Sequence, residues 1–482
     1  WDSSPTLTDV TFNDNSAVNT GGGMYMSSSS ATLTGVTFSG NTANYGGGMY
    51  LYSFSNPTMT NSILWGNSPQ EIYFYESGDG SNSITITYSD IQGGEDSIVT
   101  NDNGTVTWGS GNIDVDPRFI DSENSNYHLL ASSQLINAGD STTFDSDGSR
   151  ADMGAYPYLN SYSGPTWYIN ESGNDTTATG ASDDPFRSVQ AGINFSSDDD
   201  SVTVAAGTYV ENINFRGRNI KVAGADRETT IIDGNQSGSV VKFISGEDST
   251  AVLMGFTITN GAAENGGGIN LDQSSPSLYD LTVSQNTAFS NGGGIYCYDQ
   301  SSPILKNSSV VNNSAGQHAG GIRCWNDSNI KLENVLIANN TASQSGGGMH
   351  CRNNSSPTLM NVTIINNNAG DNAGGIYLRS NSNPIIVNSI VWGNTPQNIY
   401  FRASDSPGNI TFSYSDLQGG QDSIVTNDNG TVTWGDGNID ADSLFVVSDS
   451  ICYYPLTALS PCISSAPYSP QLSDRKRVRS GW

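Results

Sequence analysis

Positive charge is scarce in this chain. Its 482 residues include 18 Lys and Arg against 47 Asp and Glu, which gives a formal net charge of −29. Nucleic acids and anionic membranes attract basic surfaces, so we expect no nucleic acid as a partner. No apolar run approaches the roughly 20 residues that cross a bilayer, so we expect no membrane insertion either.

Cysteine and helix-forming segments are also scarce. Three of the five cysteines recur at one position of a repeat, which is not the pattern of a disulfide framework, although Cys452 and Cys462 could pair. Only 35% of the residues are hydrophobic, and they form short Val, Ile and Leu runs between residues that favour turns. This composition predicts an all-β chain of short strands joined by many turns.

Glycine, by contrast, is abundant and returns at a fixed interval. The stretch GGGIYCY from Gly292 recurs as AGGIRCW, GGGMHCR and AGGIYLR, each 27 residues after the last. A column of Asn and a column of apolar residues keep the same period. A unit of 25 to 27 residues cannot enclose a core of its own and must stack on its neighbours. The repeat therefore predicts a parallel β-helix, a solenoid with 25 to 27 residues per coil.

Alternation along the strand predicts which side chains face the lumen. The positions of Ile295 and Cys297 are apolar in every unit, so we expect both inside and Tyr296 and Tyr298 facing water. Inside the lumen the cysteines act as small hydrophobic residues, with a metal site as the alternative. The stacked cysteines are Cys297, Cys324 and Cys351.

A longer duplication divides the chain into two tandem copies. NSILWGNSPQEIYF from Asn61 returns as NSIVWGNTPQNIYF from Asn388, and later segments repeat at the same offset. We expect residues 1–160 to be the last coils and tail of a truncated first copy. Residues 161–482 would then form the second copy, with an N-terminal capping helix, coils and a tail.

The capping helix has a recognisable sequence. Asp184 is the expected N-cap, with Pro185 behind it, and Phe186, Val189 and Ile193 fall on one face of the helix, which would cover the open end of the second stack. The first copy lacks such a helix. Its uncapped first coil predicts end-to-end self-association with another chain.

The positions that we expect to face outward carry an unusual set of side chains. Aromatic rings offer flat faces to sugar rings, and Arg binds carboxylates or sulfates in a bidentate way. The alternative is that these residues only cover an exposed sheet. The candidate glycan-binding residues are Asp272, Tyr296, Tyr298, Arg323, Trp325, His350, Arg352, Tyr377, Arg379, Tyr400 and Arg402.

The first copy keeps aromatic residues in these columns but not the arginines. Its corresponding positions include Tyr25, Tyr50 and Tyr73. This difference favours a surface that contacts glycans over a fixed catalytic apparatus.

One loop is rich in acidic residues. DSDGSRAD places Asp145, Asp147 and Asp152 at spacings found in calcium loops, but the twelve-residue hand with its terminal Glu is missing. Structural Ca²⁺ is therefore a weak prediction beside solvated turns, and we expect no other cofactor.

Two segments resemble known families. NTAFSNGGGIY from Asn286 is similar to the repeats of the polymorphic outer-membrane protein family of adhesins. SGNDTTATGASDDPFRSVQAGIN from Ser172 resembles the start of pectate-lyase-like domains, which include polysaccharide lyases. The chain thus resembles the secreted right-handed β-helix repeat proteins of bacteria. The resemblance implies a right-handed coil and an extracellular or cell-surface location.

The leading hypothesis is a segment of a larger tandem-repeat protein at the cell surface or outside the cell. It would bind a polysaccharide or cell-surface glycan, or act as an adhesin or structural stalk. The alternative is a polysaccharide lyase that acts on acidic glycans, with His350 as base between Arg323 and Arg352. No catalytic motif is matched, so the catalytic residues are unknown and we do not expect an enzyme, although the lyase remains open.

Overall fold

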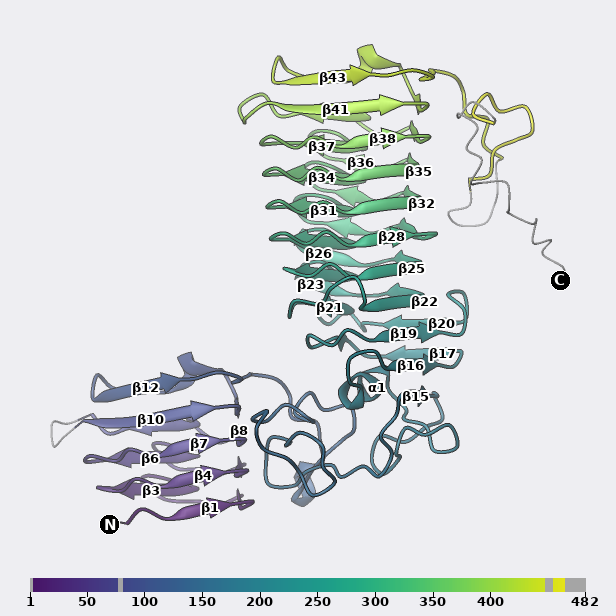
Figure 1. Cartoon of the computed structure of the whole chain (residues 1–482). Helices are drawn as coiled ribbons and strands as arrows, with labels where there is room; N and C mark the ends of the chain where they lie inside the picture. The colour runs from purple at the N-terminus through teal and green to yellow at the C-terminus, as the bar shows by residue number, and fades with distance from the viewer. Residues whose placement is uncertain (1–2, 77–80, 447–453, 464–482) are drawn as a thin grey trace. The chain divides into compact units, whose positions relative to one another are not determined.

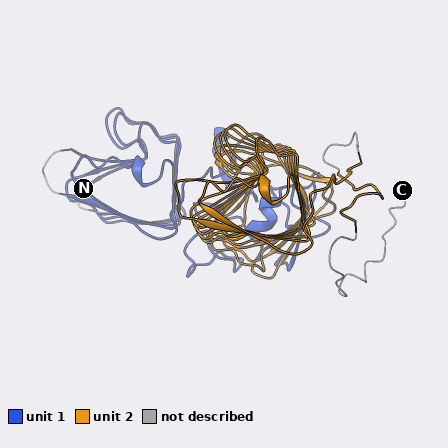
Figure 2. Cartoon of the chain, turned by 90° about the horizontal axis from the view of Figure 1, so that it is seen from above, with its two compact units in different colours: residues 1–196 blue, residues 197–482 orange. Residues whose placement is uncertain are grey.

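The chain forms two compact units of stacked coils, unit 1 (residues 1–196) and unit 2 (residues 197–482). The computed structural model describes residues 3–76, 81–446 and 454–463. In each unit the strands of successive coils pair in parallel, so that one coil lies on the next (Figure 1). Viewed along the axis of unit 2, the coils superpose (Figure 2). The predicted all-β parallel solenoid is confirmed.

Unit 1 has three parallel sheets and a short antiparallel pair. The first has the order β1 (Thr6–Thr8), β4 (Thr32–Thr34), β7 (Thr58–Thr60), β10 (Asn82–Thr87), β12 (Gly104–Trp108). The second has the order β11 (Asp90–Ile91), β8 (Ile63–Trp65), β5 (Thr37–Ser39), β2 (Thr11–Asn13). The third has the order β3 (Met24–Ser27), β6 (Met49–Tyr52), β9 (Ile72–Phe74). The antiparallel pair is β13 (Phe119–Asp121) and β14 (Asn126–Leu129).

Unit 2 repeats this plan over more coils. Its longest sheet follows β16 (Ser201–Val204), β19 (Lys221–Gly224), β22 (Val252–Thr259), β25 (Ser277–Ser284), β28 (Ile304–Lys306), β32 (Lys331–Ala338), β35 (Thr358–Ile365), β38 (Ile385–Val387), β41 (Gly408–Ser413) and β43 (Gly430–Trp434). Strands beside this path are β17 (Gly207–Val210), β20 (Thr230–Asp233), β29 (Ser309–Val311), β39 (Ile390–Trp392) and β42 (Asp416–Leu417).

Two further sheets close the coils of unit 2. One has the order β18 (Ile213–Asn214), β21 (Val241–Phe243), β24 (Ile269–Asp272), β27 (Ile295–Tyr298), β31 (Ile322–Trp325), β34 (Met349–Arg352), β37 (Ile376–Leu378), β40 (Ile399–Phe401). The other has the order β23 (Ala262–Asn265), β26 (Thr287–Asn291), β30 (Ser314–Ala315), β33 (Thr341–Ala342), β36 (Asn368–Ala369). The described residues also form three short 3₁₀ helices: Glu95–Ser97, Ser122–Asn124 and Gln421–Ser423.

The boundary between the compact units lies after residue 196, not after residue 160. The intervening segment holds β15 (Thr166–Ile169) and helix α1 (Val189–Phe195), and it packs within unit 1. The Phe195 ring lies 5.3 Å from the ring of Tyr158. The Asn194 side-chain amide donates to the carbonyl oxygens of Ala131 and Ser133. The division of the repeat copies at residue 160 stays a prediction from the sequence.

The helix starts later than expected. Its N-cap is Ser188, whose hydroxyl accepts a hydrogen bond from Ala191 N at 3.3 Å. Asp184 instead accepts hydrogen bonds from the backbone and hydroxyl of Thr179, so its carboxylate is used in the turn before the helix. The predicted burial is confirmed, since Phe186, Val189 and Ile193 are fully buried, but Phe186 lies before the helix and not on its face.

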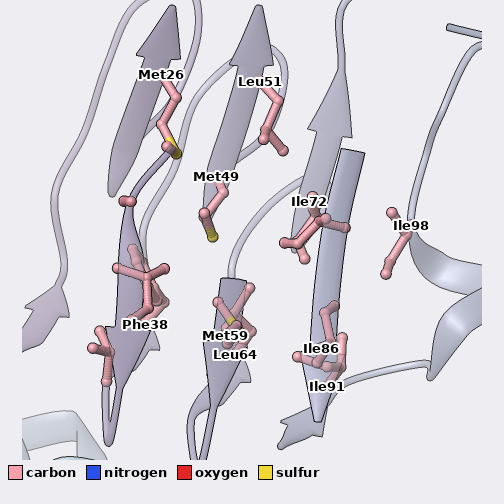
Figure 3. Close-up of a cluster of buried hydrophobic side chains, with 14 of the residues drawn as sticks. Met26, Phe38, Met49, Leu51, Met59, Leu64, Ile72, Ile86, Ile91 and Ile98 are labelled. Carbon is pink, nitrogen blue, oxygen red and sulfur yellow. The ribbon is translucent and has the colours of Figure 1, made fainter. Parts of the chain in front are cut away.

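The lumen of both units is apolar, as the alternation predicted. In unit 1 it is filled by stacked Met, Leu, Ile and Phe side chains (Figure 3). In unit 2 Ile295 and Cys297 are fully buried, and Cys324 and Cys351 stack in register with Cys297 without a disulfide. The suggested pairing of Cys452 with Cys462 lies outside the described residues.

A buried ladder of asparagines ties the coils together. Asn340 Nδ2 donates to Val310 O and to Asn367 Oδ1, both at 2.9 Å, and Asn340 Oδ1 accepts from the backbone and amide N–H groups of Asn313. Because each amide uses its donors and its acceptor, the ladder satisfies polar groups that a coil corner would otherwise bury unpaired.

In unit 1 the same ladder ends on a carboxyl group instead of an amide. Glu71 is 4% exposed and accepts hydrogen bonds from the backbone and side-chain nitrogens of Asn67 at 3.1 and 2.5 Å. In unit 2 the corresponding end of the ladder is Asn398, which accepts from Asn394. Burial raises the pKa of Glu71 to about 7, while the Asn67 hydrogen bonds act in the opposite direction.

Glu71 makes the stability of unit 1 depend on pH. A carboxyl whose pKa is raised by folding contributes most below its unfolded value near 4.5, and this contribution is lost as the pH rises to about 7. We expect Glu71→Gln to raise the free energy of unfolding by about 3 kcal/mol at pH 8 and to change it little at pH 4. Urea unfolding of the two proteins at both pH values measures the difference; an equal effect at pH 4 and pH 8 would contradict it.

Candidate functional site

The candidate residues lie on one sheet of unit 2, the sheet that contains β24, β27, β31, β34, β37 and β40. The register pairs Tyr296 with Arg323 and Tyr298 with Trp325 on successive coils. We define the inner tier as Asn270, Tyr296, Arg323, His350, Tyr377 and Tyr400. We define the outer tier as Asp272, Tyr298, Trp325, Arg352, Arg379 and Arg402. The structure thus brings all eleven candidates together in two stacked columns.

The two tiers differ in exposure, which corrects the expectation that both face water. The outer tier is half-buried at every position. In the inner tier Tyr296 is only 6% exposed, Arg323 is 1% exposed and His350 is fully buried. The prediction that Tyr296 faces water is therefore wrong, although its side chain points away from the lumen.

The turn before each strand explains this burial. Gly292 has a φ of +67°, and a Cβ at this position would lie 3.0 Å from Tyr296 Cβ and 2.8 Å from Ile295 O. The turn therefore folds back against the base of the inner-tier side chain. Glycine is needed here because the positive φ and the lack of space both disfavour a side chain.

Arg323 and His350 form a hydrogen-bonded pair inside the inner tier. Arg323 Nη1 donates to His350 Nδ1 at 3.0 Å. Because the guanidinium can only donate, Nδ1 is the acceptor and the proton of the neutral imidazole lies on Nε2. His350 Nε2 and Arg323 Nε have no hydrogen-bond partner among the described residues.

Trp325 of the outer tier packs against two cations. Its ring centroid lies 4.9 Å from Arg323 Cζ and 5.1 Å from Arg352 Cζ, which are distances of cation–π contacts. The Tyr298 ring lies edge-on to it at 5.5 Å. Trp325 Nε1 and Arg352 Nε are buried, and within the described part of the chain neither has a hydrogen-bond partner.

The arginines differ in their counter-ions. Arg379 Nε lies 2.6 Å from Asp405 Oδ2, and Arg402 Nε lies 3.9 Å from Asp405 Oδ1. Among residues 3–76, 81–446 and 454–463, no carboxylate is within ion-pair distance of Arg323 or Arg352. The middle of the two tiers is therefore a local positive region on a strongly acidic protein.

Burial and the arginines set the protonation of this region. Burial lowers the pKa of His350 well below its ordinary value, and the charge of Arg323 adds to the effect. The same two causes lower the pKa of His318 to about 4, so both imidazoles are neutral at pH 7. Burial also lowers the pKa of Arg323 to about 10, which still leaves its guanidinium charged.

Three residues of this region were not among the candidates. The His318 ring lies 4.8 Å from that of His350, and Asn291 has a buried side-chain oxygen without a partner among the described residues. Asn291 and His318 occupy a repeat column of their own at the coil corner. This column is the sequence pattern from which the two residues could have been found. Asp405 follows β40 in an irregular segment outside the repeat columns, so no column pointed to it.

Unit 1 carries the same columns without cations. The rings of Tyr25, Tyr50 and Tyr73 stack at 5.5 and 5.6 Å with nearly parallel planes. Tyr52 and Tyr75 form a second aromatic pair at 4.9 Å. The corresponding columns of unit 1 are therefore aromatic, and among the described residues they carry no Arg, Lys or His.

The acidic loop of unit 1 uses its carboxylates within the fold. Asp152 accepts hydrogen bonds from Asn137 N and Tyr158 N, both at 2.7 Å, and Asp145 accepts one from Asp152 N. Asp147 accepts from Ser149 and Asn160. In the described part of the chain, no three His, Cys, Asp or Glu side chains are grouped so that they could hold a metal ion.

Other surface features lie apart from the two tiers. A hollow of about 780 Å³ on the longest sheet of unit 2 is lined by residues that include Arg227, Asn334 and Tyr454, and by none of the candidates. Among the described helices, none has the length and apolar character needed to span a bilayer.

Comparisons with known proteins agree with this architecture. The family model described as right handed beta helix region matches residues 2–120 and 318–442, about half of the chain. The Chlamydia polymorphic membrane protein repeat matches residues 280–298, which contain β27.

One solved structure shows a distant similarity. It is that of pectate lyase Pel9A, with 15% identity, a TM-score of 0.39, and coverage of 64% of this chain and 93% of that one. A search of curated proteins finds no match. The family match confirms the right-handed coil, and the chain belongs to the family of proteins with a right handed beta helix region.

Proposed function

We propose that this chain is part of a secreted or cell-surface β-helix protein that binds an acidic glycan along the two tiers. The repeat at residues 280–298, similar to that of Chlamydia polymorphic membrane proteins, supports the location. The surface chemistry of unit 2 supports the ligand class. Glycan binding by stacked coils would allow the chain to act in adhesion. The regular stack of coils would also suit a structural stalk.

The half-buried outer tier is the observation that carries the proposal. Tyr298, Trp325 and Arg352 lie in register on successive coils, about 4.8 Å apart along the axis. Such a column offers an extended polymer one contact per coil. Partly exposed aromatic and Arg side chains supply most of the binding energy in many interfaces.

The charge distribution favours an acidic ligand. The chain as a whole has a net charge of −29 and repels polyanions, whereas Arg352, Arg379 and Arg402 follow one another in the outer tier with Asp405 as their only close carboxylate among the described residues. A polyanion would therefore be attracted to this column and repelled by the other faces.

Binding to immobilised polysaccharide tests the proposal. We expect the full chain to be retained by polygalacturonate or dextran sulfate, and we expect Trp325→Ala combined with Arg352→Ala to weaken retention at least about tenfold. Lys331→Ala is the matched control, because it removes an exposed cation from the neighbouring sheet. Equal retention of all three proteins would contradict the proposal.

The geometry favours binding over lyase chemistry. His350, the base that a lyase would need, is fully buried, and its Nδ1 accepts a hydrogen bond from Arg323. Unsaturated products of a lyase absorb ultraviolet light. We expect no such absorbance from polygalacturonate incubated with the full chain. If the absorbance appeared, the chain would be a lyase and the binding proposal would be wrong.

A further inference from the structure

The inner tier contains a cation that the fold itself does not neutralise. Arg323 is 1% exposed, carries its charge at neutral pH, and has no carboxylate within ion-pair distance among the described residues. A buried, unpaired charge costs stability. The missing counter-ion favours a binding role for Arg323 over a structural one.

Four buried N–H groups of this cation and its neighbours have no hydrogen-bond partner among the described residues. They belong to Arg323 Nε, Trp325 Nε1, His350 Nε2 and Arg352 Nε, on the adjacent strands β31 and β34. All four atoms are buried, and a buried donor without an acceptor costs about 1–3 kcal/mol. The two guanidinium groups lie against the Trp325 ring on adjacent coils, and each has a buried Nε–H without an acceptor among the described residues.

Trp325 separates this cluster from solvent. Its ring packs on Arg323 at 4.9 Å and on Arg352 at 5.1 Å, and the residue is half-buried. A rotation of this one side chain would uncover the guanidinium groups of Arg323 and Arg352. The backbone need not move, because Trp325 lies in the outer tier.

We propose that this cluster is a subsite for an oxyanion substituent of the glycan, a carboxylate or a sulfate ester, which enters beside Trp325. The inference rests on the proposed glycan binding and assigns its charge selectivity to Arg323, which His350 holds in place through the hydrogen bond from Arg323 Nη1 to His350 Nδ1. A carboxylate or sulfate accepts several charge-assisted hydrogen bonds at once, which matches the unpaired Nε–H groups of Arg323 and Arg352. The ligand's charge supplies the counter-ion that Arg323 lacks.

Buried oxygen atoms without a hydrogen-bond donor, on the coils before β31, indicate how the bound sugar would be oriented. Asp272 Oδ1 and Asn291 Oδ1 are buried without a partner in the described part of the chain. Asp272 is in register with Tyr298, which is in register with Trp325. Hydroxyl groups of the sugar would donate to these oxygens, while its anionic substituent lies at β31 and β34.

Calorimetric titration of the full chain tests the subsite. The probes are oligogalacturonate, dextran sulfate of matched length, and neutral dextran. We expect Arg323→Met and Arg323→Gln each to weaken binding of the anionic probes roughly 10- to 100-fold, as loss of charge-assisted hydrogen bonds implies. Lys331→Ala should bind like the unaltered chain. The two anionic probes show whether carboxylate or sulfate is preferred.

Thermal unfolding without ligand separates a binding role from a structural one. Removing an unpaired buried charge should leave the melting temperature of Arg323→Met equal to or above that of the unaltered chain. A clear decrease would show that Arg323 supports the fold, and the subsite would be wrong.

The outcomes also separate this inference from the proposed function. In one outcome the chain binds neutral dextran and both anionic probes with equal affinity, and Arg323→Met binds them equally well. That result would contradict the subsite and would leave the proposed glycan binding in place. Failure of all three probes to bind would overturn both.

Discussion

Replacing Asn340 by alanine is expected to lower the free energy of unfolding of unit 2 by about 4 kcal/mol. Asn340 is fully buried and occupies the middle of the asparagine ladder. Without its amide, Val310 O loses one donor, and the backbone and side-chain N–H groups of Asn313 lose their acceptor. Each buried group left without a partner costs about 1–3 kcal/mol, which makes the total large for a single substitution.

A surface ladder supplies the matched control. Asn334 Nδ2 donates to Asn307 Oδ1 at 3.0 Å on the exposed side of the coils, and its φ is +57°. Asn334→Gly removes this amide while keeping a residue that adopts the same φ, so we expect a loss below about 1 kcal/mol.

Urea unfolding of the full chain compares the two variants. Hydrogen exchange of β30, β33 and β36 then shows whether protection is lost locally around Asn340. Similar values for Asn340→Ala and Asn334→Gly would mean that the buried ladder contributes no more than surface amides do.

The second large effect is expected at Gly320, in the repeated glycine-rich turn before β31. A Cβ on Gly320 would collide with the carbonyl group of Thr341 on the next coil and would lie 2.5 Å from Thr341 N. The obstacle is backbone, so it cannot move aside as a flexible side chain would. We expect Gly320→Ala to destabilise unit 2 by about 3 kcal/mol or more, because neighbouring coils must separate.

The residue just before it behaves in the opposite way. Ala319 has a φ of +59°, where a side chain costs roughly 1 kcal/mol or more. Ala319→Gly should therefore leave the stability unchanged or raise it. Melting temperatures of the two variants test this contrast. A destabilising Ala319→Gly or a harmless Gly320→Ala would show that this glycine-rich turn has another role.

The architecture could be predicted because each repeat column records a local requirement. Gly292 marks a turn with positive φ, Asn340 marks a corner whose polar groups need partners, and Ile295 and Cys297 mark the lumen. These requirements recur in every coil, so a single sequence reveals them. The α1 N-cap was missed because Ser188 and Asp184 are both good caps, and the choice depends on the contacts of Asp184 with Thr179.

The candidate site could be predicted only in part. Alternation identified the two outward columns, but it could not show that the turns cover the inner one, as the burial of Tyr296 and His350 demonstrates. Exposure depends on how the turn folds against the strand and on the stacking of long side chains. Asp405 was missed because an ion pair from an irregular segment leaves no periodic signal.

A crystal structure of the full chain with a bound oligogalacturonate or sulfated oligosaccharide tests the central claim most directly. We predict an oxyanion within about 2.7–3.2 Å of Arg323 Nε, with the Trp325 ring turned aside and the sugar chain along the outer tier. A ligand bound on another face, with Trp325 still packed on Arg323, would contradict the account.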